Sequence, residues 1–413
     1  MTVGRRKLML VSVLIVMVSA LFRPMMTTTG SSKPIQNHFT IEKNGVVMTD
    51  QHTTAAAVIV MQDPIQDDFQ PSTFPTTSAK RLCSGKEITR GQWEPITLPR
   101  PPYIPMSPRV RCLSQSEFSK PFSTWQWLPD PAQGCVMATL DRQDFLRRLV
   151  NTTVAFIGDS LTLEHYASLV HLLGDRARLP PRAVQHGRIR RRICAPLRNH
   201  TTYRHDPSFQ PYNECMDLIF KTDFYLENIT QEVVESKPSV LVLNRGAHYT
   251  PDEDLVTSLR QYTLPALKQW DYKCSTSRTR CLLIWRTTVP GHPFCEKFTS
   301  PARSVEEMER WIHVMSNKDE GGGYRKGEYH WQDFQRQNQL VVSHLLQDEW
   351  RSLLPHIDIQ IMDSYQPNVL RPDSHRSHMG DCLHSCSPGG GSDLNSHWLY
   401  HILLRHQERK NGI

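Results

Sequence analysis

"VAFIGDSLTLEH", residues 154–165, is an apolar strand pattern that runs through Gly158-Asp159-Ser160 into a helical pattern. Glycine permits the sharp turn that such a junction needs. The pattern therefore predicts that Ser160 lies at a helix N-terminus and at the edge of a sheet, where its amide and the helix dipole can stabilise a developing oxyanion. Two interpretations stay open here: Ser160 is a nucleophile, or Asp159 or Ser160 only caps the helix.

Strand and helix patterns alternate along the rest of the chain. Further apolar strands are expected at residues 239–244, 281–286 and 357–363, and helical patterns at 161–174, 252–270, 303–316, 330–354 and 393–408. Apolar strands between amphipathic helices are typical of a mostly parallel sheet that is covered by helices on both faces. The sequence therefore predicts an α/β domain over residues 141–413.

The preceding segment, residues 81–140, has a different character. It combines many prolines with three cysteines and three tryptophans, and it shows few long periodic stretches. This composition predicts a small N-terminal lobe that is pinned by disulfides. Residues 23–80 are rich in Thr, Ser, Pro and Gln, which is typical of a disordered stem.

The first 22 residues predict a route into the secretory pathway. "GRRK" (4–7) precedes an uncharged apolar run at 8–22. A helix of this length spans roughly 22 Å, short of a hydrocarbon core of about 30 Å. It therefore fits a cleaved signal peptide with a site at "VSA" (18–20), or a short signal anchor in a thin membrane. An anchor would keep the basic residues cytosolic and make residues 23–80 a lumenal stem.

Cysteines and glycosylation sequons agree with that compartment. An even number of scattered cysteines is typical of disulfides in an oxidising environment. Spacing does not give their pairing, and the candidates are Cys83, Cys112, Cys135, Cys194, Cys215, Cys274, Cys281, Cys295, Cys382 and Cys386. Asn-x-Thr sequons lie at Asn151, Asn199 and Asn228. We expect the body of the protein to lie outside the cytosol.

The charge of the chain argues against a nucleic-acid partner. The formal net charge is +7, from Lys+Arg 48 against Asp+Glu 41, and no basic stripe is interleaved with aromatic residues. The short run "GRIRRR" (187–192) fits a solvated surface segment or a contact for an acidic glycan.

"DCLHSC", residues 381–386, contains a histidine and an aspartate that can activate a serine nucleophile. Such a nucleophile needs a base and a group that orients the base. With Asp381 and His384 three residues apart on a turn, the carboxylate can hold one imidazole nitrogen while the other faces the serine. Residues 375–386 also contain enough His, Cys and Asp for tetrahedral zinc. In an oxidising compartment Cys382 and Cys386 are expected in disulfides instead, so we expect no metal.

Two more polar residues follow predicted strands. Asn244 ends the strand in "LVLNRGAHY" (241–249), and Arg286 ends the strand in "LLIWRTTVPGH" (282–292). Open parallel sheets bind ligands beyond the carboxyl ends of their strands. We therefore expect both side chains near Ser160, with Asn244 as a donor to an oxyanion.

These ordered blocks resemble the SGNH/GDSL hydrolase superfamily. More closely, the chain from Cys83 onwards is similar to the PC-esterase group and its plant trichome birefringence-like polysaccharide O-acetyltransferases. The similarity includes "GQW", "WQWLP", "FLRRL…VAFIGDSL", "WRT…PGH" and "DCLHSCSPG". The short anchor and stem also resemble that family's Golgi architecture. The chain differs at "LTLEH", where plant members usually continue with Ser/Gly-Arg-Asn.

The resemblance implies a three-layer SGNH-hydrolase-like fold and a set of residue roles. Ser160 would be the nucleophile, His384 the base and Asp381 its orienter. Asn244 and the Ser160 amide would form the oxyanion hole, and Gly187 is a candidate for the superfamily's glycine donor. Further candidates for oxyanion or substrate contact are Arg286 and Asp159.

The resemblance also implies a function. We expect a glycan O-acetyltransferase with an acyl-serine intermediate and no bound cofactor, in which acetyl-CoA or another acetyl carrier is the co-substrate and a glycan the acceptor. It would be a single-pass Golgi membrane protein held by its N-terminal helix, or secreted after signal cleavage. The alternatives are a glycan O-acetylesterase with the same triad, and a non-catalytic lumenal glycan-binding protein that would have lost a triad residue.

Overall fold

The computed structural model describes residues 41–42, 45–46, 81–105, 110–175, 187–195, 215–277, 280–316 and 330–410. The predicted signal or anchor at 1–22 lies outside these residues, as does nearly all of the stem at 23–80. Both therefore stay predictions. Within the stem, β1 (Ile41–Glu42) pairs antiparallel with β2 (Gly45–Val46). Among the described helices, none has the length and apolarity that a membrane span requires.

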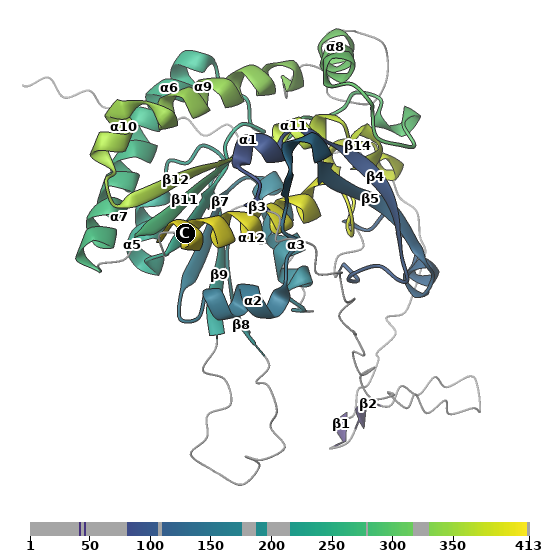
Figure 1. Cartoon of the computed structure of the whole chain (residues 1–413), viewed down its shortest axis with the longest axis horizontal. Coiled ribbons are helices and arrows are strands. Elements are labelled where there is room, and N and C mark those ends of the chain that lie inside the picture. The colour runs from purple at the N-terminus through teal and green to yellow at the C-terminus, as the bar shows by residue number, and fades with distance from the viewer. Residues whose placement is uncertain are drawn as a thin grey trace, which may run out of the picture. The chain divides into compact units, whose positions relative to one another are not determined.

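A six-stranded sheet with the order β12-β11-β10-β7-β9-β8 forms the centre of the fold (Figure 1). Its strands, in that order, are Ile357–Met362, Cys281–Arg286, Val240–Leu243, Thr153–Gly158, Cys215–Thr222 and Arg188–Cys194. All neighbours run parallel except β8, which is antiparallel to β9. The predicted α/β fold with a mostly parallel sheet is confirmed.

Helices cover both faces of this sheet, because alternate residues of each buried strand point to opposite sides. Val154 and Phe156 of β7 share one hydrophobic cluster with α2 (Arg142–Arg148), α3 (Ser160–Leu172), α8 (Val305–Ser316) and α12 (Gly391–Lys410). Ala155 and Ile157 belong to a second cluster with α5 (Ile229–Ser236), α6 (Asp252–Ser258), α7 (Leu264–Thr276), α9 (Phe334–Leu346) and α10 (Asp348–Leu353). The sheet is therefore the middle of three layers.

The segment at 81–140 forms β3 (Arg81–Leu82), α1 (Gly85–Ile88), β4 (Gly91–Leu98), β5 (Phe122–Pro129) and β6 (Cys135–Val136). β4 pairs with β5 and β3 with β6. Trp93 and Trp127 of this segment belong to the same hydrophobic cluster as α3 and α12. On α12, the Nδ1 atoms of His397 and His401 accept hydrogen bonds from the backbone of the segment. Residues 81–140 thus share a core with the α/β domain.

The carboxyl-terminal part adds α11 (Tyr365–Val369), β13 (His375–Arg376) and β14 (Asp381–Ser385) before α12. β13 and β14 pair antiparallel. The glycines that follow β14 are needed for a tight entry into α12: a Cβ on Gly391 would lie 1.6 Å from Asn368 Oδ1. They belong to a closely packed turn.

All ten cysteines are paired. The disulfides join Cys83 to Cys135, Cys112 to Cys386, Cys194 to Cys215, Cys274 to Cys281, and Cys295 to Cys382. The two cysteines of "DCLHSC" therefore reach different partners, one in the N-terminal segment and one beyond β11. Both bonds hold β14 to distant parts of the chain.

The basic run at 187–192 is mostly edge strand β8. Arg188 pairs with Glu232 and Arg190 pairs with Asp217, so both guanidinium groups already have protein partners. Charged side chains on an edge strand also discourage pairing with another sheet. The position of these arginines on an edge strand and their ion pairs account for the basic run without an acidic glycan as its partner. Of the predicted sequons, Asn151 and Asn228 are exposed, and Asn199 lies outside the described residues.

Candidate active site

The junction between β7 and α3 assigns different tasks to Asp159 and Ser160. Asp159 is fully buried and is the N-cap: its Oδ1 accepts from the amides of Leu161 at 2.9 Å and Thr162 at 3.3 Å. Ser160, the first residue of α3, is partly exposed at the carboxyl edge of the sheet. The close turn requires Gly158, because a Cβ there would lie 2.7 Å from the carbonyl oxygen of Asn244. Capping therefore does not occupy the serine hydroxyl.

β14 carries Asp381 and His384 to this serine. His384 Nε2 lies 2.8 Å from Ser160 Oγ, and His384 Nδ1 lies 2.8 Å from Asp381 Oδ2. An ionised carboxylate can only accept, so Nδ1 carries the proton and Nε2 accepts from the serine hydroxyl. Asp381 is fixed in turn, because its Oδ1 accepts from the amides of Leu383 and His384 at 3.1 Å each. The three side chains form one hydrogen-bonded chain.

The surroundings tune both titratable groups of this chain. Burial raises the pKa of Asp381, but the hydrogen bond and charge of His384 and the two backbone amides outweigh it, and the pKa lies well below its usual range. Burial lowers the pKa of His384, but the Asp381 hydrogen bond and the charges of Glu164 and Asp381 outweigh it, and the pKa lies above its ordinary value. Asp381 therefore stays ionised, and His384 is a stronger base than a free imidazole.

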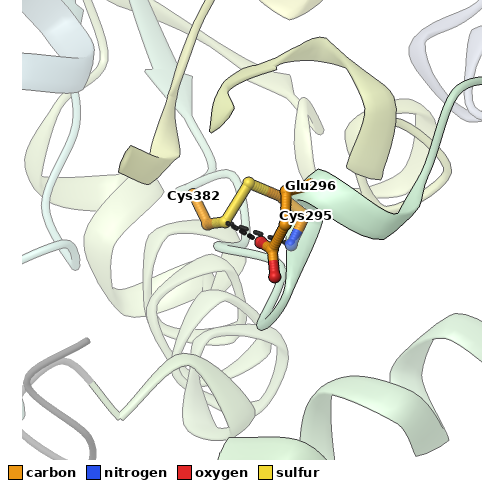
Figure 2. Close-up of side chains that lie close together, drawn as sticks. All are labelled: Cys295, Glu296 and Cys382. Atoms are coloured by element: carbon orange, nitrogen blue, oxygen red, sulfur yellow. Dashed lines mark hydrogen bonds between the residues drawn. A yellow bond between two sulfur atoms is a disulfide. The ribbon is translucent and has the colours of Figure 1, made fainter. Parts of the chain in front are cut away.

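The disulfide between Cys295 and Cys382 holds β14 in place (Figure 2). Cys382 lies between Asp381 and His384, its Sγ accepts from the amide of Cys295 at 3.1 Å, and its carbonyl accepts from the amide of His292 at 2.9 Å. Glu296 lies beside the disulfide. Zinc binds cysteine as the thiolate. The sulfurs of Cys382 and Cys386 are both oxidised, so the zinc interpretation has no support here.

Asn244 lies at this edge, but it offers no free donor to an oxyanion. It is fully buried, and its amide nitrogen donates to the carbonyl of Arg286 at 2.9 Å and to Thr288 Oγ1 at 3.0 Å. Its Oδ1 faces Thr162 Oγ1 at 3.4 Å. Both amide hydrogens are therefore used to join the ends of β10 and β11. This geometry therefore does not support the predicted role of Asn244 as a hydrogen-bond donor to an oxyanion.

Arg286 and Asp159 also differ from their predicted role as substrate contacts. Arg286 is 1% exposed and donates to Thr162 Oγ1 at 3.3 Å, underneath α3. Burial lowers its pKa to about 10, while the charges of Asp159 and Glu164 oppose that shift. The two residues are a buried cation and anion below the helix that carries Ser160, and neither side chain is open to solvent.

Gly187 lies at the amino end of β8, at the same edge of the sheet. Its carbonyl accepts from the amide of Thr222, at the end of β9. β9 separates β8 from β7. Within the described residues no contact joins Gly187 to Ser160, so its role as an oxyanion donor stays a prediction.

The sequence patterns do not single out two charged residues next to His384. Glu164 lies one helical turn after Ser160, and its Oε2 accepts from the amide of Ser385 at 3.2 Å. Arg376 on β13 pairs with Glu164 and donates to the carbonyl of Ser385 at 3.0 Å. The i, i+4 spacing from Ser160 was a usable signal for Glu164. No local pattern pointed to Arg376.

A serine at the amino end of a helix, bonded to a histidine that an aspartate holds, is the arrangement of serine-type acyl-ester enzymes. The chain belongs to the PC-esterase family, described as a GDSL/SGNH-like acyl-esterase family found in Pmr5 and Cas1p, whose model matches residues 137–401. The protein is therefore an enzyme that transfers an acyl group or cleaves an acyl ester.

Several similar proteins come from plants. Protein trichome birefringence-like 19 of Arabidopsis thaliana is 23% identical over 79% of this chain and 82% of its own length. Trichome birefringence-like 20 is 21% identical over 80% and 73%. Xyloglucan O-acetyltransferase 3 of Populus trichocarpa is 39% identical over 16% of this chain and 15% of its own. The periplasmic domain of a lipopolysaccharide acetyltransferase of Salmonella ser. Paratyphi A aligns over 66% of this chain and 92% of that one at 10% identity, with a TM-score of 0.27 that is too low to argue from.

Proposed function

We propose that the protein is a glycan O-acetyltransferase that works through an acyl-Ser160 intermediate. The observation that carries this proposal is the pair of 2.8 Å contacts that His384 makes with Ser160 and Asp381. The plant relatives supply the choice of acetyl group and of a polysaccharide acceptor, since one of them is a xyloglucan O-acetyltransferase.

The first half of the reaction loads the enzyme. Ser160 Oγ attacks the carbonyl carbon of the acetyl donor, and its proton passes to His384 Nε2. The negative charge that develops on the carbonyl oxygen faces the Ser160 amide and the positive end of α3. The bond to the donor's leaving group then breaks, and that group takes the proton from His384. An acetyl-Ser160 ester and a free donor alcohol or thiol remain.

The second half passes the acetyl group on. A sugar hydroxyl gives its proton to His384 Nε2 and attacks the acetyl carbon. The ester bond to Ser160 breaks, and Ser160 Oγ takes the proton back from His384. Asp381 remains ionised throughout and stabilises the imidazolium that forms in each half. The donor, acetyl-CoA or another acetyl carrier, is a co-substrate that leaves after the first half.

A glycan O-acetylesterase is the second candidate, because the family is described as one of acyl-esterases and the same three residues would serve water as the acceptor. Transfer and hydrolysis differ in whether the acyl-enzyme meets a sugar or water first. A non-catalytic glycan-binding protein is disfavoured, since all three residues are present and hydrogen-bonded. We place the enzyme in the Golgi membrane with a lumenal catalytic domain, or outside the cell after signal cleavage.

The test is to incubate the full-length protein with an acetyl donor and a panel of glycans, and to follow both by mass spectrometry. Acetyl gain on a glycan supports transfer, and acetyl loss from a pre-acetylated glycan supports the esterase. Ser160→Ala should abolish either reaction and the acetylated Ser160 peptide, whereas Ser343→Ala, on the exposed face of α9, should not. Full activity of Ser160→Ala would refute the mechanism.

A further inference from the structure

One face of α3 contacts two successive residues of β14. Ser160 and Glu164 are one turn apart, so their side chains leave the same face of the helix. Ser160 Oγ meets the ring of His384, and Glu164 Oε2 accepts from the amide of Ser385 at 3.2 Å. Glu164 thus holds the backbone that immediately follows His384, and the distance between Ser160 and His384 depends on this second contact.

Arg376 completes the arrangement from β13. Its guanidinium pairs with Glu164, its Nε donates to the carbonyl of Ser385 at 3.0 Å, and its Nη1 lies 4.0 Å from Asp381 Oδ2. The side chains of Arg376 and Glu164 are only 12% and 11% exposed. Water therefore screens these charges little. One guanidinium lies between two carboxylates, and His384 is next to both.

The charges around His384 favour its protonated form. Glu164 and Asp381 carry two negative charges against the single positive charge of Arg376, so the group has a net charge of −1 until the imidazole takes a proton. The buried neighbour His375, whose Nδ1 lies 3.3 Å from the His384 carbonyl, adds no charge, because burial lowers its pKa well below the ordinary value. Removal of Glu164 would make the group neutral, and removal of Arg376 would make it more negative.

We propose that Glu164 and Arg376 are positioning residues of the reaction, which hold the His384 segment against α3 and set how readily His384 takes a proton. The proposal rests on the role of His384 as the general base. It gives a purpose to the "LTLEH" stretch that follows Ser160, because Glu164 is the member of that stretch that reaches β14. The negative charge of Glu164 raises the pKa of His384, and the positive charge of Arg376 lowers it.

The experiment measures kcat/KM of the full-length protein against pH with p-nitrophenyl acetate, a small ester that needs no glycan. Glu164→Gln should move the acid limb of the profile to lower pH by about one unit, because a nearby negative charge is lost. Arg376→Gln should move it to higher pH by a similar amount, and the double variant should return toward the wild-type midpoint. Asp358→Asn, which removes an ion pair with Arg409 at the opposite edge of the sheet, is the matched control and should leave the midpoint in place.

The outcomes separate this proposal from the proposed function. Shifts of opposite sign in the two single variants support it. A loss of kcat in both variants with an unmoved midpoint, or shifts of the same sign, would show a purely structural brace and overturn it. If Glu164→Gln does not fold, Arg376→Gln decides alone, and a midpoint that stays or falls overturns the proposal. If Ser160→Ala hydrolyses the ester as fast as wild type, the triad itself is wrong.

Discussion

Ser160 Oγ and His384 Nε2 lie 2.8 Å apart although 224 residues separate them in the chain. The serine lies at the carboxyl end of β7 in the parallel sheet. Two disulfides, one within β14 and one directly after it, hold β14 at the same edge. The contact therefore depends on elements from both ends of the α/β domain.

Asp381→Asn should keep the fold and lose most of the activity. An amide can donate to Nδ1, which favours the tautomer with the proton on Nε2, where it cannot accept from Ser160. We expect kcat to fall by about 10³- to 10⁴-fold. The measurement is steady-state hydrolysis of a small acetyl ester, with the melting temperature as a check on folding. Near-normal kcat would show that Asp381 does not orient His384.

Activity should rise with pH through a midpoint above that of a free histidine. The base works only when His384 is neutral, and its pKa lies above the ordinary value of 6.5 because the Asp381 hydrogen bond and the charges of Glu164 and Asp381 outweigh burial. The check is a profile of kcat/KM against pH, which reports the free enzyme. A midpoint at or below that of free histidine would contradict the electrostatics described here.

The folded state should lose stability as the pH falls from about 6.5 to 4. Burial lowers the pKa of His292 and of His397 to about 4 each, whereas unfolded histidine titrates near 6.5. Between these values the unfolded chain binds more protons, so unfolding becomes easier by about 1.4 kcal/mol per group and pH unit at most. Above pH 6.5 both histidines are neutral in the folded and in the unfolded chain, so this effect vanishes.

The measurement is chemical unfolding at a series of pH values. His397→Gln provides the comparison, because an amide can still accept from the Leu140 amide that His397 Nδ1 contacts at 3.0 Å. This variant should show a shallower loss of stability at acid pH than wild type. An equal slope would mean that His397 does not contribute.

Removal of the Cys295–Cys382 disulfide should cost more than removal of Cys274–Cys281. The first closes a sequence separation of 87 residues and the second one of 7. Loop entropy alone predicts a difference of about 2 kcal/mol in the free energy of unfolding. The Cys→Ala double variants, compared by urea unfolding, test this. Only the first pair should also lower esterase activity, since Cys382 lies between Asp381 and His384.

Asn244→Ala should act on stability rather than on the chemical step alone. The substitution removes the Asn244 donor from the buried Arg286 carbonyl and from Thr288 Oγ1, and losing a buried hydrogen-bond partner costs about 1–3 kcal/mol. Thr288 Oγ1 keeps its bond to the Arg245 carbonyl. We expect a lower melting temperature together with reduced labelling of Ser160 by a fluorophosphonate. A large loss of kcat at unchanged stability would instead restore Asn244 as an oxyanion donor.

The sequence interpretation located most of the sheet but not all of it. β7, β10 and β11 are continuous apolar runs, which parallel strands buried on both faces produce. The outermost strand β12 instead alternates isoleucines with Asp358 and Gln360. The sequence of β8 favours a basic surface run, because three consecutive arginines separate the buried residues Ile189 and Ile193. β9 was missed as well, although it lies between β7 and β8. The edge strand β8 has a weaker apolar pattern because one of its sides lacks a partner strand. β9 has partners on both sides, but Asp217 and Lys221 interrupt its apolar residues.

By itself, the sequence determined the class of fold, the residue types of the site and the presence of paired cysteines. These depend on local periodicity, on the chemistry of single side chains and on composition. Only the tertiary structure decided which cysteines pair, and that Asp159 caps α3 while Ser160 faces His384. It also decided that the side-chain amide of Asn244 already donates to protein acceptors, and that Glu164 and Arg376 join α3 to β14. Hydrogen-bond and ion-pair partners are chosen by distance in space, and a partner hundreds of residues away leaves no periodic trace in the chain.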